Sequence, residues 1–364
     1  MTRVLAICAF LIAFCIAHAK SDSDILAEKI HAGIPEWMKE QAERDLAHFR
    51  GYPLSRKKIS DFYESCPKEH YLIRFTIHNN RVTTEWKEKD TPGMDYRREI
   101  FEHALKKLAK AVQLPNTTFL LSMHDAYTIS GDVPVFSMCK REQDCGAILL
   151  PDYDALQAKF QVLPKRDLTS YEPRWEEKAT QLVWRGSSAQ ASLDGELMRA
   201  DNVDRFSRVI LCKLSQQYPA LIDAKFTFLA QGGEHIPSLK AFLVPFMSFE
   251  QLMQYKYQLF IDGNVTPYSA SGWKFFSNSL IFKADSPWYQ WYFAALKPFE
   301  HYIPVRADLA DLVDGILWAK SHENEARMIA KRCRECAISS ITLPDNLLYL
   351  YYIIDQYSHL DFVE

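Results

Sequence analysis

The sequence predicts an α/β fold in which parallel strands are covered by helices on both faces. Short apolar runs that fit buried strands alternate with helical patterns along the chain, and this alternation is typical of the class. The chain has 364 residues, of which 48% are hydrophobic, so it is long enough for two such units. Its 43 basic and 46 acidic residues nearly balance, so nucleic acid is not expected as a partner and an anionic ligand needs a local site. The composition leaves a soluble enzyme or binding protein.

The first 19 residues have the three parts of a secretory signal peptide. Arg3 is followed by an apolar run from Val4 to Ala17 and by the small-residue ending Ala17-His18-Ala19. A spanning helix needs about 20 apolar residues, so this shorter run favours export over a permanent anchor, and no later stretch is apolar enough to span a bilayer. We therefore expect an exported protein without a stable membrane span after cleavage. It would reside in the secretory pathway or endoplasmic reticulum lumen of a eukaryote, or otherwise be extracytoplasmic or secreted.

Six cysteines remain beyond the signal peptide, an even number that permits disulfides in an exported chain. Cys139 and Cys145 close a short loop, and we expect this pair to be bridged. Cys333 and Cys336 have the spacing of a redox pair. They fall late in a predicted helix, however, and not at the helix N-terminus that lowers the pKa of a thiol, which favours a structural role.

The first half is expected to form a unit over residues 20–165 in which helices and strands alternate. The expected elements are a helical region over 24–49 that restarts at Pro35, two strands over 70–86 that turn at Asn79-Asn80, an amphipathic helix over 97–112 and a strand over 118–123. The last of these is a short apolar run of the kind that buried parallel strands have.

The second half is expected to form a unit over residues 166–340 and repeats the alternation. The expected elements are strands over 181–184, 257–261, 279–282 and 301–305, a helix over 203–217, a helix beginning at Ser286-Pro287 and a helix capped by Asp308. The boundary is expected between residues 163 and 174, which are rich in proline and charge. Residues 341–364 are expected to form a terminal helix that packs back on the two units.

In doubly wound sheets, ligands bind beyond the carboxyl ends of the strands, where helix N-termini attract anions. This rule selects the loop Trp184-Arg185-Gly186-Ser187-Ser188, which follows a predicted strand. Arg185 can fork onto phosphate oxygens, Gly186 lets a ligand approach the backbone, and Ser187 can donate from the start of a helix. The alternative is an ordinary turn with a solvated arginine.

A second loop, residues 260–274, lies between two apolar strands and opens a helix. Its small, hydroxyl and charged side chains suit the polar rim and the phosphates of a nucleotide, and the residues concerned are Asp262, Gly263, Ser269, Ser271 and Lys274. Asp262 can accept hydrogen bonds from ribose hydroxyls, and Lys274 can approach a phosphate. The alternative is that Asp262 only caps a turn.

A third loop begins with Asp125 at the end of the clearest strand of the first half. A carboxylate there faces the space between the two units and can act as a general base toward an acceptor hydroxyl. A lone aspartate at a strand end can equally have no chemical role. The commonest hydrolase, dinucleotide, NTPase and zinc-protease motifs are absent from the sequence.

Taken in order, these loops and their neighbouring segments resemble glycosyltransferase family 90, which contains the protein O-glucosyltransferases and the fungal capsule-associated xylosyltransferases. The similarity is strongest in Gln254-Tyr255-Lys256-Tyr257, Ile261-Asp262-Gly263, Ser279-Leu280-Ile281-Phe282, and from Leu296 to Val305 with Asp308-Leu309. It extends to Trp184-Arg185-Gly186-Ser187, to residues 219–224 and, more weakly, to residues 43–49, His124-Asp125 and residues 133–137. The similarity therefore covers nearly the whole mature chain.

The resemblance implies a GT-B fold, in which two Rossmann-like domains face each other across a cleft and the C-terminal one holds most of the nucleotide sugar. It implies inverting transfer from a UDP-sugar to an acceptor hydroxyl on a protein or glycan, with no cofactor and no essential metal. Asp125 matches the general base of the family, and Arg185 with Ser187 matches its diphosphate-binding segment.

The sequence departs from the family pattern at two places. Where many members have an arginine, this chain has Ser269-Ala270-Ser271-Gly272, so hydroxyls, backbone N–H groups or Lys274 must neutralise the diphosphate. The residues around Asp125 also differ from the Asp-Tyr-Pro pattern of the glucosyltransferases.

Two alternatives to a metal-independent transferase stay open. One is a secreted protein that keeps the nucleotide- or glycan-binding cleft but has lost catalysis. The other is a metal-dependent transferase using Asp152 and Asp154, whose D-x-D form many glycosyltransferases use to hold a divalent metal and a sugar diphosphate. That segment follows Pro151 and also fits a helix cap. The sugar also stays open, as does whether the acceptor is a protein, a lipopolysaccharide or a capsular glycan.

Overall fold

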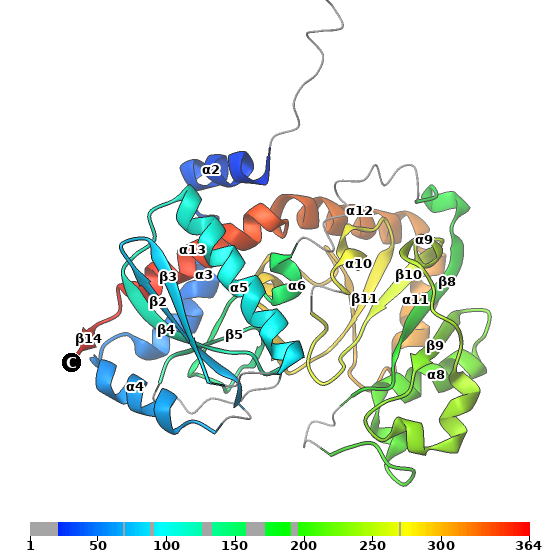
Figure 1. The fold of residues 1–364 in the computed structure, drawn as a ribbon. Coiled ribbons are helices and arrows are strands. Elements are labelled where there is room, and N and C mark those ends of the chain that lie inside the picture. Colours follow the sequence, from blue (N-terminus) through cyan, green and yellow to red (C-terminus); the bar gives the residue numbers. More distant parts are fainter. Residues whose placement is uncertain are drawn as a thin grey trace, which may run out of the picture.

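The computed structural model describes residues 21–67, 70–87, 91–125, 133–157, 172–190, 196–268 and 271–364. The predicted signal peptide and the predicted division between residues 165 and 166 lie outside the described residues. Figure 1 shows two α/β halves, with α12 (Glu323–Ser340) and α13 (Leu343–Ser358) running along one side of both.

The other helices have the following bounds. The α-helices are α2 (Asp22–Ala32), α3 (Glu36–Leu46), α4 (Arg56–Ser65), α5 (Pro92–Ala111), α6 (Tyr153–Leu156), α8 (Ser207–Gln217), α9 (Phe249–Leu252), α10 (Trp273–Phe276) and α11 (Leu312–Ser321). Short 3₁₀ helices are η1 (Ala47–Phe49), η4 (Trp175–Glu177), η5 (Val203–Arg205), η6 (Gly233–His235), η7 (Pro237–Phe242) and η9 (Trp291–Ala295).

The strands fall into two five-stranded sheets and two short pairs. They are β1 (Leu54–Ser55), β2 (Leu72–His78), β3 (Arg81–Trp86), β4 (Thr117–Ser122), β5 (Val135–Ser137), β6 (Lys140–Arg141), β7 (Ala147–Leu149), β8 (Ala179–Ser187), β9 (Ile222–Phe228), β10 (Tyr255–Phe260), β11 (Leu280–Ala284), β12 (Trp288–Tyr289), β13 (Ile303–Val305) and β14 (Phe362–Val363). The predicted α/β class is therefore confirmed.

The C-terminal half is built on a parallel sheet in the order β13-β11-β10-β8-β9. Read from the β9 edge, the strands of this sheet follow the order 2-1-3-4-5 in the chain, which is that of flavodoxin-like sheets. Trp184 and Tyr257 pack into the core on one face, and Val183 and Phe260 into the core on the other. The strand order reverses between β8 and β10, and such a switch point leaves a crevice beyond the carboxyl ends of these two strands.

The N-terminal half has a mixed sheet in the order β3-β2-β4-β5-β7. Strands β4, β5 and β7 are parallel, whereas β2 runs antiparallel to both β3 and β4. Asn79 and Asn80 make the predicted turn between β2 and β3, both in the left-handed region with φ of 48° and 62°. The expectation of parallel sheets alone is therefore wrong for this half, because the hairpin inserts β2 in the opposite direction.

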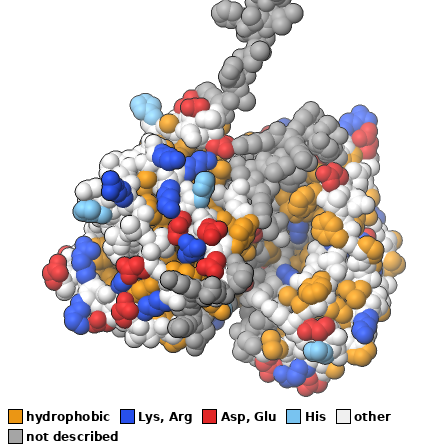
Figure 2. Space-filling model, in the orientation of Figure 1, with side chains coloured by type: hydrophobic (Ala, Val, Ile, Leu, Met, Phe, Trp, Pro, Cys, Tyr) orange, Lys and Arg blue, Asp and Glu red, His pale blue; other side chains and the backbone are white. Residues whose placement is uncertain are grey.

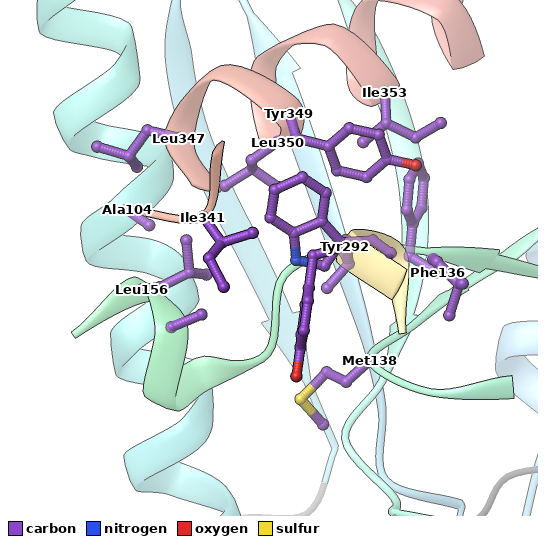
Figure 3. Close-up of a cluster of buried hydrophobic side chains, with 14 of the residues drawn as sticks. Ala104, Phe136, Met138, Leu156, Tyr292, Ile341, Leu347, Tyr349, Leu350 and Ile353 are labelled. Carbon is purple, nitrogen blue, oxygen red and sulfur yellow. The ribbon is translucent and has the colours of Figure 1, made fainter. Parts of the chain in front are cut away.

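One apolar cluster connects the two halves (Figure 3). Trp291 of η9 stacks on Tyr349 of α13 with 4.5 Å between ring centroids. Figure 3 shows Tyr292, Phe136 and Met138 gathered below the same helix. Helix α13 also packs on α2, α3, α5 and α6, so a C-terminal element completes the core of the N-terminal half.

Reciprocal capping holds the ends of the two helices that pack there. The Asp24 carboxylate accepts a hydrogen bond from the Ser21 N–H at 3.1 Å, while the Ser21 hydroxyl accepts one from the Asp24 N–H at 3.2 Å. Thr342 and Asp345 form the same arrangement at α13. Asp345 also forms an ion pair with Lys29 of α2 at 2.6 Å, which ties the terminal helix to the beginning of the described chain.

Two local expectations are wrong. Ser286-Pro287 does not begin a helix, because the next residues form β12, which pairs antiparallel with β6 of the N-terminal half. Cys139 and Cys145 are free thiols, so the predicted bridge is not formed: the first is buried and the second lies exposed on a turn. Cys333 is buried in α12, as the structural role predicted for it requires.

The surface of the described residues carries mixed charges. On the face shown in Figure 2, basic and acidic side chains are interspersed over the N-terminal half, and hydrophobic side chains are more frequent over the C-terminal half. No helix within the described residues has both the length and the apolar character required to cross a bilayer.

Candidate functional site

The carboxyl ends of β8 and β10 are held together by Arg208, from the first turn of α8. Its Nε donates to the Asp262 carbonyl at 2.7 Å, and its Nη1 donates to the carbonyls of Ser187 and Ala189 at 3.1 and 2.9 Å. These carbonyls belong to the two loops that leave the switch point of the sheet. The arginine therefore fixes both loops where the topology favours a ligand.

The third nitrogen of Arg208, Nη2, has no hydrogen-bond partner within the described part of the chain. A Cβ atom added to Gly263 would lie 2.7 Å from it, so the glycine leaves room for this nitrogen. Burial lowers the pKa of Arg208 to about 10, and the guanidinium lies 5.6 Å from the centre of the Trp184 ring. A buried arginine that stays charged at neutral pH and has one nitrogen left to donate suits an anionic ligand.

Asp262 follows β10 at the same edge. Its Oδ2 accepts a hydrogen bond from the Ser286 hydroxyl at 2.6 Å. Burial raises the pKa of Asp262 to about 6, and the Ser286 hydrogen bond together with Lys283 and Arg208 opposes this rise. The side chain is therefore mostly ionised at neutral pH, and its Oδ1 has no hydrogen-bond partner within the described ranges.

Asp125 lies three residues beyond the end of β4, in the N-terminal half. Its Oδ1 accepts a hydrogen bond from Nη1 of Arg97 at 2.7 Å, and this nitrogen also donates to the Met123 carbonyl at 2.6 Å. Burial opposes the charge of Arg97, but Asp125, Tyr153 and Tyr268 together raise the pKa of the guanidinium. About a third of the Asp125 side chain, 35%, is exposed.

Tyr268 brings the two halves together at this point. It belongs to the loop after β10, and its hydroxyl donates to the backbone carbonyl of Asp125 at 3.4 Å. Its ring meets that of Tyr153 edge to face, with 5.8 Å between centroids. The predicted general base and the predicted nucleotide loop are therefore in contact.

Arg185 lies elsewhere. Its Nη2 forms an ion pair with Asp223 of β9 at 2.7 Å, and its Nη1 donates to the carbonyls of Asp223 and Trp184. Only 9% of its side chain is exposed. The guanidinium is thus turned to the neighbouring strand, and the arginine at the strand ends is Arg208.

The two neighbours of Arg185 in the predicted motif have backbone roles. A Cβ atom on Gly186 would lie 2.4 Å from the Trp184 ring, so the glycine lets this indole fold over the strand. Ser187 contributes its carbonyl to Arg208. Neither contact involves a ligand. Gly186 is therefore a packing residue, and Ser187 lies beside the switch point.

Lys274 is buried beneath the second loop. Its Nζ donates to the Leu259 carbonyl at 2.8 Å, and only 8% of the residue is exposed. Burial, with Arg208 nearby, lowers its pKa to about 7. The Ser271 N–H donates to the Tyr268 carbonyl at 2.8 Å, whereas Ser269 lies outside the described residues.

Asp152 caps α6 and accepts a hydrogen bond from the Ala155 N–H at 3.0 Å. Asp154 lies in the first turn of the same helix. Within the described residues, no group of three or more histidine, cysteine or acidic side chains is placed to hold a metal ion. The D-x-D segment thus has the helix-cap geometry that was one of its two interpretations.

Arg208, Arg97 and Tyr268 were not singled out from the sequence. Arg208 stands in the first turn of a helix that follows a strand of a parallel sheet, where the rule on strand ends could have found it. The sequence pattern predicts that a helix begins at Arg97, but α5 begins at Pro92, which places Arg97 in its second turn. Its contact with Asp125 spans 28 residues, and nothing in the local pattern signals it.

The chain belongs to glycosyltransferase family 90. The family profile described as Glycosyl transferase family 90 matches residues 35–363, which confirms the resemblance in the loops. Protein O-glucosyltransferase 2 of Danio rerio is 30% identical over 336 residues, covering 88% of this chain and 62% of the relative. Protein O-glucosyltransferase 3 of Mus musculus is 28% identical over 303 residues, covering 79% and 55%.

Coverage differs among the relatives. The chain spans about three fifths or less of the two relatives above, but 78% of protein O-glucosyltransferase 1 of Rattus norvegicus, to which it is 24% identical over 87% of its own length. A solved glycosyltransferase from Rickettsia africae ESF-5 aligns at 11% identity with a TM-score of 0.33, over 62% of this chain and 63% of that one. A likeness this distant adds nothing to the fold described above.

Proposed function

We propose that this protein transfers a sugar from a UDP-sugar to an acceptor hydroxyl, with inversion at the anomeric carbon. The observation that carries the proposal is the hydrogen bond from Tyr268 to the backbone of Asp125, because it joins the loop after β10 to the loop after β4. The loop that carries Asp125 thus contacts the loop that follows β10, one of the two strands at the switch point. Membership of family 90 supports glycosyl transfer as the class of reaction.

The donor would bind beyond the ends of β8 and β10. Nη2 of Arg208, which lies next to Gly263 and has no partner among the described residues, would donate to the diphosphate. The first turn of α8 holds no acidic residue, so its positive dipole end favours the same charge. Asp262 would accept hydrogen bonds from the ribose hydroxyls through Oδ1, and Ser271 would line the polar rim.

Asp125 would act as the general base. Its Oδ2 would take the proton of the acceptor hydroxyl while the acceptor oxygen bonds to the anomeric carbon. The bond from that carbon to the UDP oxygen breaks, and its electron pair leaves with the phosphate. Arg208 would stabilise the negative charge that develops there without a metal ion or other cofactor.

A protein acceptor fits the relatives best. The three named relatives are protein O-glucosyltransferases, so UDP-glucose and a serine or threonine hydroxyl of a protein are the first substrates to test. A UDP-pentose remains the second donor class. The predicted signal peptide would bring the enzyme into the secretory pathway, where proteins in transit are available as acceptors.

A non-catalytic binding protein is the second candidate, and one observation favours it. Arg185 is engaged by Asp223 and Lys274 is buried on a backbone carbonyl, so within the described ranges Arg208 is the arginine left to face the leaving diphosphate. Such a site can suffice to hold UDP but be too weakly charged to drive its departure.

The test is a donor screen with purified protein. UDP-glucose, UDP-galactose and UDP-xylose are incubated with and without EDTA, and UDP release is measured alongside UDP affinity. Release from at least one donor, unaffected by EDTA and abolished in Asp125→Asn, supports the proposal. Binding of UDP without release from any donor supports the binding protein, and loss of release in EDTA with recovery in manganese supports a metal-dependent enzyme.

A further inference from the structure

Arg97 contacts Asp125 in a way that divides the two oxygens of the carboxylate. Nη1 of Arg97 donates a hydrogen bond to Oδ1 at 2.7 Å, whereas Oδ2 has no hydrogen-bond partner within the described parts of the chain. The arginine is the more buried of the two, with 14% of its side chain exposed against 35% for the aspartate. Oδ1 is thus held by a side chain that is more buried than the aspartate itself, and Oδ2 is left for an acceptor.

The guanidinium of Arg97 is itself fixed by its surroundings. The same Nη1 donates to the Met123 carbonyl at 2.6 Å, at the end of β4. The guanidinium carbon lies 4.6 Å from the centre of the Tyr153 ring, and this ring meets Tyr268 edge to face. Elements from both halves of the molecule therefore hold the arginine in the orientation that meets Asp125.

Several other titratable groups face this carboxylate. They are His124 beside it in the chain, Tyr153 of α6, Tyr268 of the loop after β10 and Cys139 after β5. Burial, with His70 and Arg97, lowers the pKa of His124, and burial raises the pKa values of Tyr153, Tyr268 and Cys139. All four are therefore mainly neutral at pH 7, and among the described residues Arg97 is the charged side chain that forms an ion pair with Asp125.

We propose that Arg97 is the positioning residue of the general base: it holds Oδ1 and turns Oδ2 toward the acceptor hydroxyl. The proposal rests on the proposed function, in which Asp125 is that base. Without the arginine the carboxylate can rotate, so Oδ2 is less often placed to take the acceptor proton, and kcat falls while donor binding does not.

The experiment measures kcat and KM for the hydrolysis of UDP-glucose by the purified protein, as UDP release at pH 6. The variants are Arg97→Gln, which keeps a donor but loses the charge, and Arg97→Lys, which keeps the charge. Arg98→Gln is the matched control, because Arg98 is the next residue of α5 and pairs with Glu102 at 2.6 Å. UDP affinity and thermal unfolding are measured for each variant.

We expect Arg97→Gln to lower kcat about ten- to a hundredfold at pH 6, a part of the 10²- to 10⁴-fold that a positioned base contributes. Its KM for UDP-glucose should change less than twofold, because Arg97 does not touch the proposed donor site. Arg97→Lys, which can still donate to Oδ1, should recover part of kcat. UDP affinity should change less than twofold in both, and Arg98→Gln should behave as the native protein.

A purely structural role for Arg97 predicts a different pattern. It would lower the unfolding temperature, kcat and UDP affinity together, with no recovery in Arg97→Lys, and this outcome overturns the proposal. An unchanged kcat in Arg97→Gln overturns it too. Asp125→Asn separates this failure from that of the proposed function, since an active Asp125→Asn protein refutes the base itself, whereas an inactive one beside an unaffected Arg97→Gln refutes only the positioning role.

Discussion

The two sheets of this protein have the same number of strands and contribute differently to the candidate site. The C-terminal sheet is parallel throughout, so all its strands end at one edge, and the loops after β8 and β10 meet there on Arg208. The N-terminal sheet is mixed, and its candidate reactive group among the described residues, Asp125, lies in the loop after β4.

This difference indicates that the C-terminal half binds the ligand and that the N-terminal half supplies the reactive group. A parallel sheet with a switch point gathers backbone groups and one arginine from distant parts of the chain, which suits the binding of a large anionic ligand. A mixed sheet can present a single side chain at a strand end and hold it by a neighbouring helix, which suits a general base. The predictions below test this division, from the largest expected effect to the smallest.

The largest effect is expected at the base. Asp125→Asn should lower transfer or donor hydrolysis about 10²- to 10⁴-fold, because the amide cannot take the acceptor proton. UDP affinity, measured by titration calorimetry, should stay within twofold, because binding belongs to the other half. Asp308→Asn is the control, since Asp308 is exposed and pairs with Arg306 at 2.7 Å. A large loss of UDP affinity in Asp125→Asn would contradict the claim that UDP binding belongs to the C-terminal half.

Two arginines of the C-terminal half provide the next comparison. Arg208→Gln should weaken UDP binding about ten- to a hundredfold, because a hydrogen bond to a charged group contributes about 1.5–3 kcal/mol. Arg185→Gln should leave UDP binding nearly unchanged but lower the unfolding temperature, since it leaves Asp223 without its ion pair. Calorimetric titration of both variants, with the folded fraction checked by circular dichroism, decides between them. The reverse ranking would restore Arg185 as the diphosphate ligand.

Two glycines should separate packing from binding in the same way. Gly186→Ala should destabilise the fold by about 1–3 kcal/mol, because the new methyl group would lie 2.4 Å from the Trp184 ring. Gly263→Ala should mainly weaken UDP binding, because its methyl group would lie 2.7 Å from Nη2 of Arg208, a side-chain end that can shift. Urea unfolding and UDP titration of both variants test this. Equal losses of stability and affinity at the two positions would contradict it.

The smallest effect concerns Lys274 and depends on pH. The folded-state pKa is about 7 and the unfolded value about 10.4, so between these values the unfolded chain binds more protons and native stability rises with pH. Lys274→Met removes the buried charge and should raise the melting temperature by a few degrees at pH 6, with a gain that shrinks toward pH 10. Calorimetric melting over this range measures the difference. A gain independent of pH would mean that packing, and not charge, accounts for it.

The sequence predicted the C-terminal sheet better than the N-terminal one, for a physical reason. Strands buried on both faces are continuous apolar runs, and those over 181–184, 257–261 and 279–282 correspond to β8, β10 and β11. The order of these strands, and hence the switch point, depends on contacts between residues far apart in the chain. No local pattern encodes it.

The candidate site was predicted in its loops and less well in its side chains. Strand ends and glycines mark loops 184–188 and 260–274 from the sequence, because both features are local. Arg185 and Arg208 cannot be told apart in that way, since each has a charge and a position near a strand end. In the folded sheet Asp223 pairs with Arg185, whereas Arg208 keeps one nitrogen without a hydrogen-bond partner among the described residues. This difference depends on the pairing of β8 with β9 and cannot be seen in the sequence.

Hydrogen exchange measured with and without UDP tests most directly whether the nucleotide binds at the switch point. Bound UDP should slow exchange in the segments after β8 and β10, residues 187–190 and 261–268, and in the first turn of α8. Protection confined to another part of the molecule, such as the surface pocket lined by Phe299, Trp318 and Met328, would contradict the account.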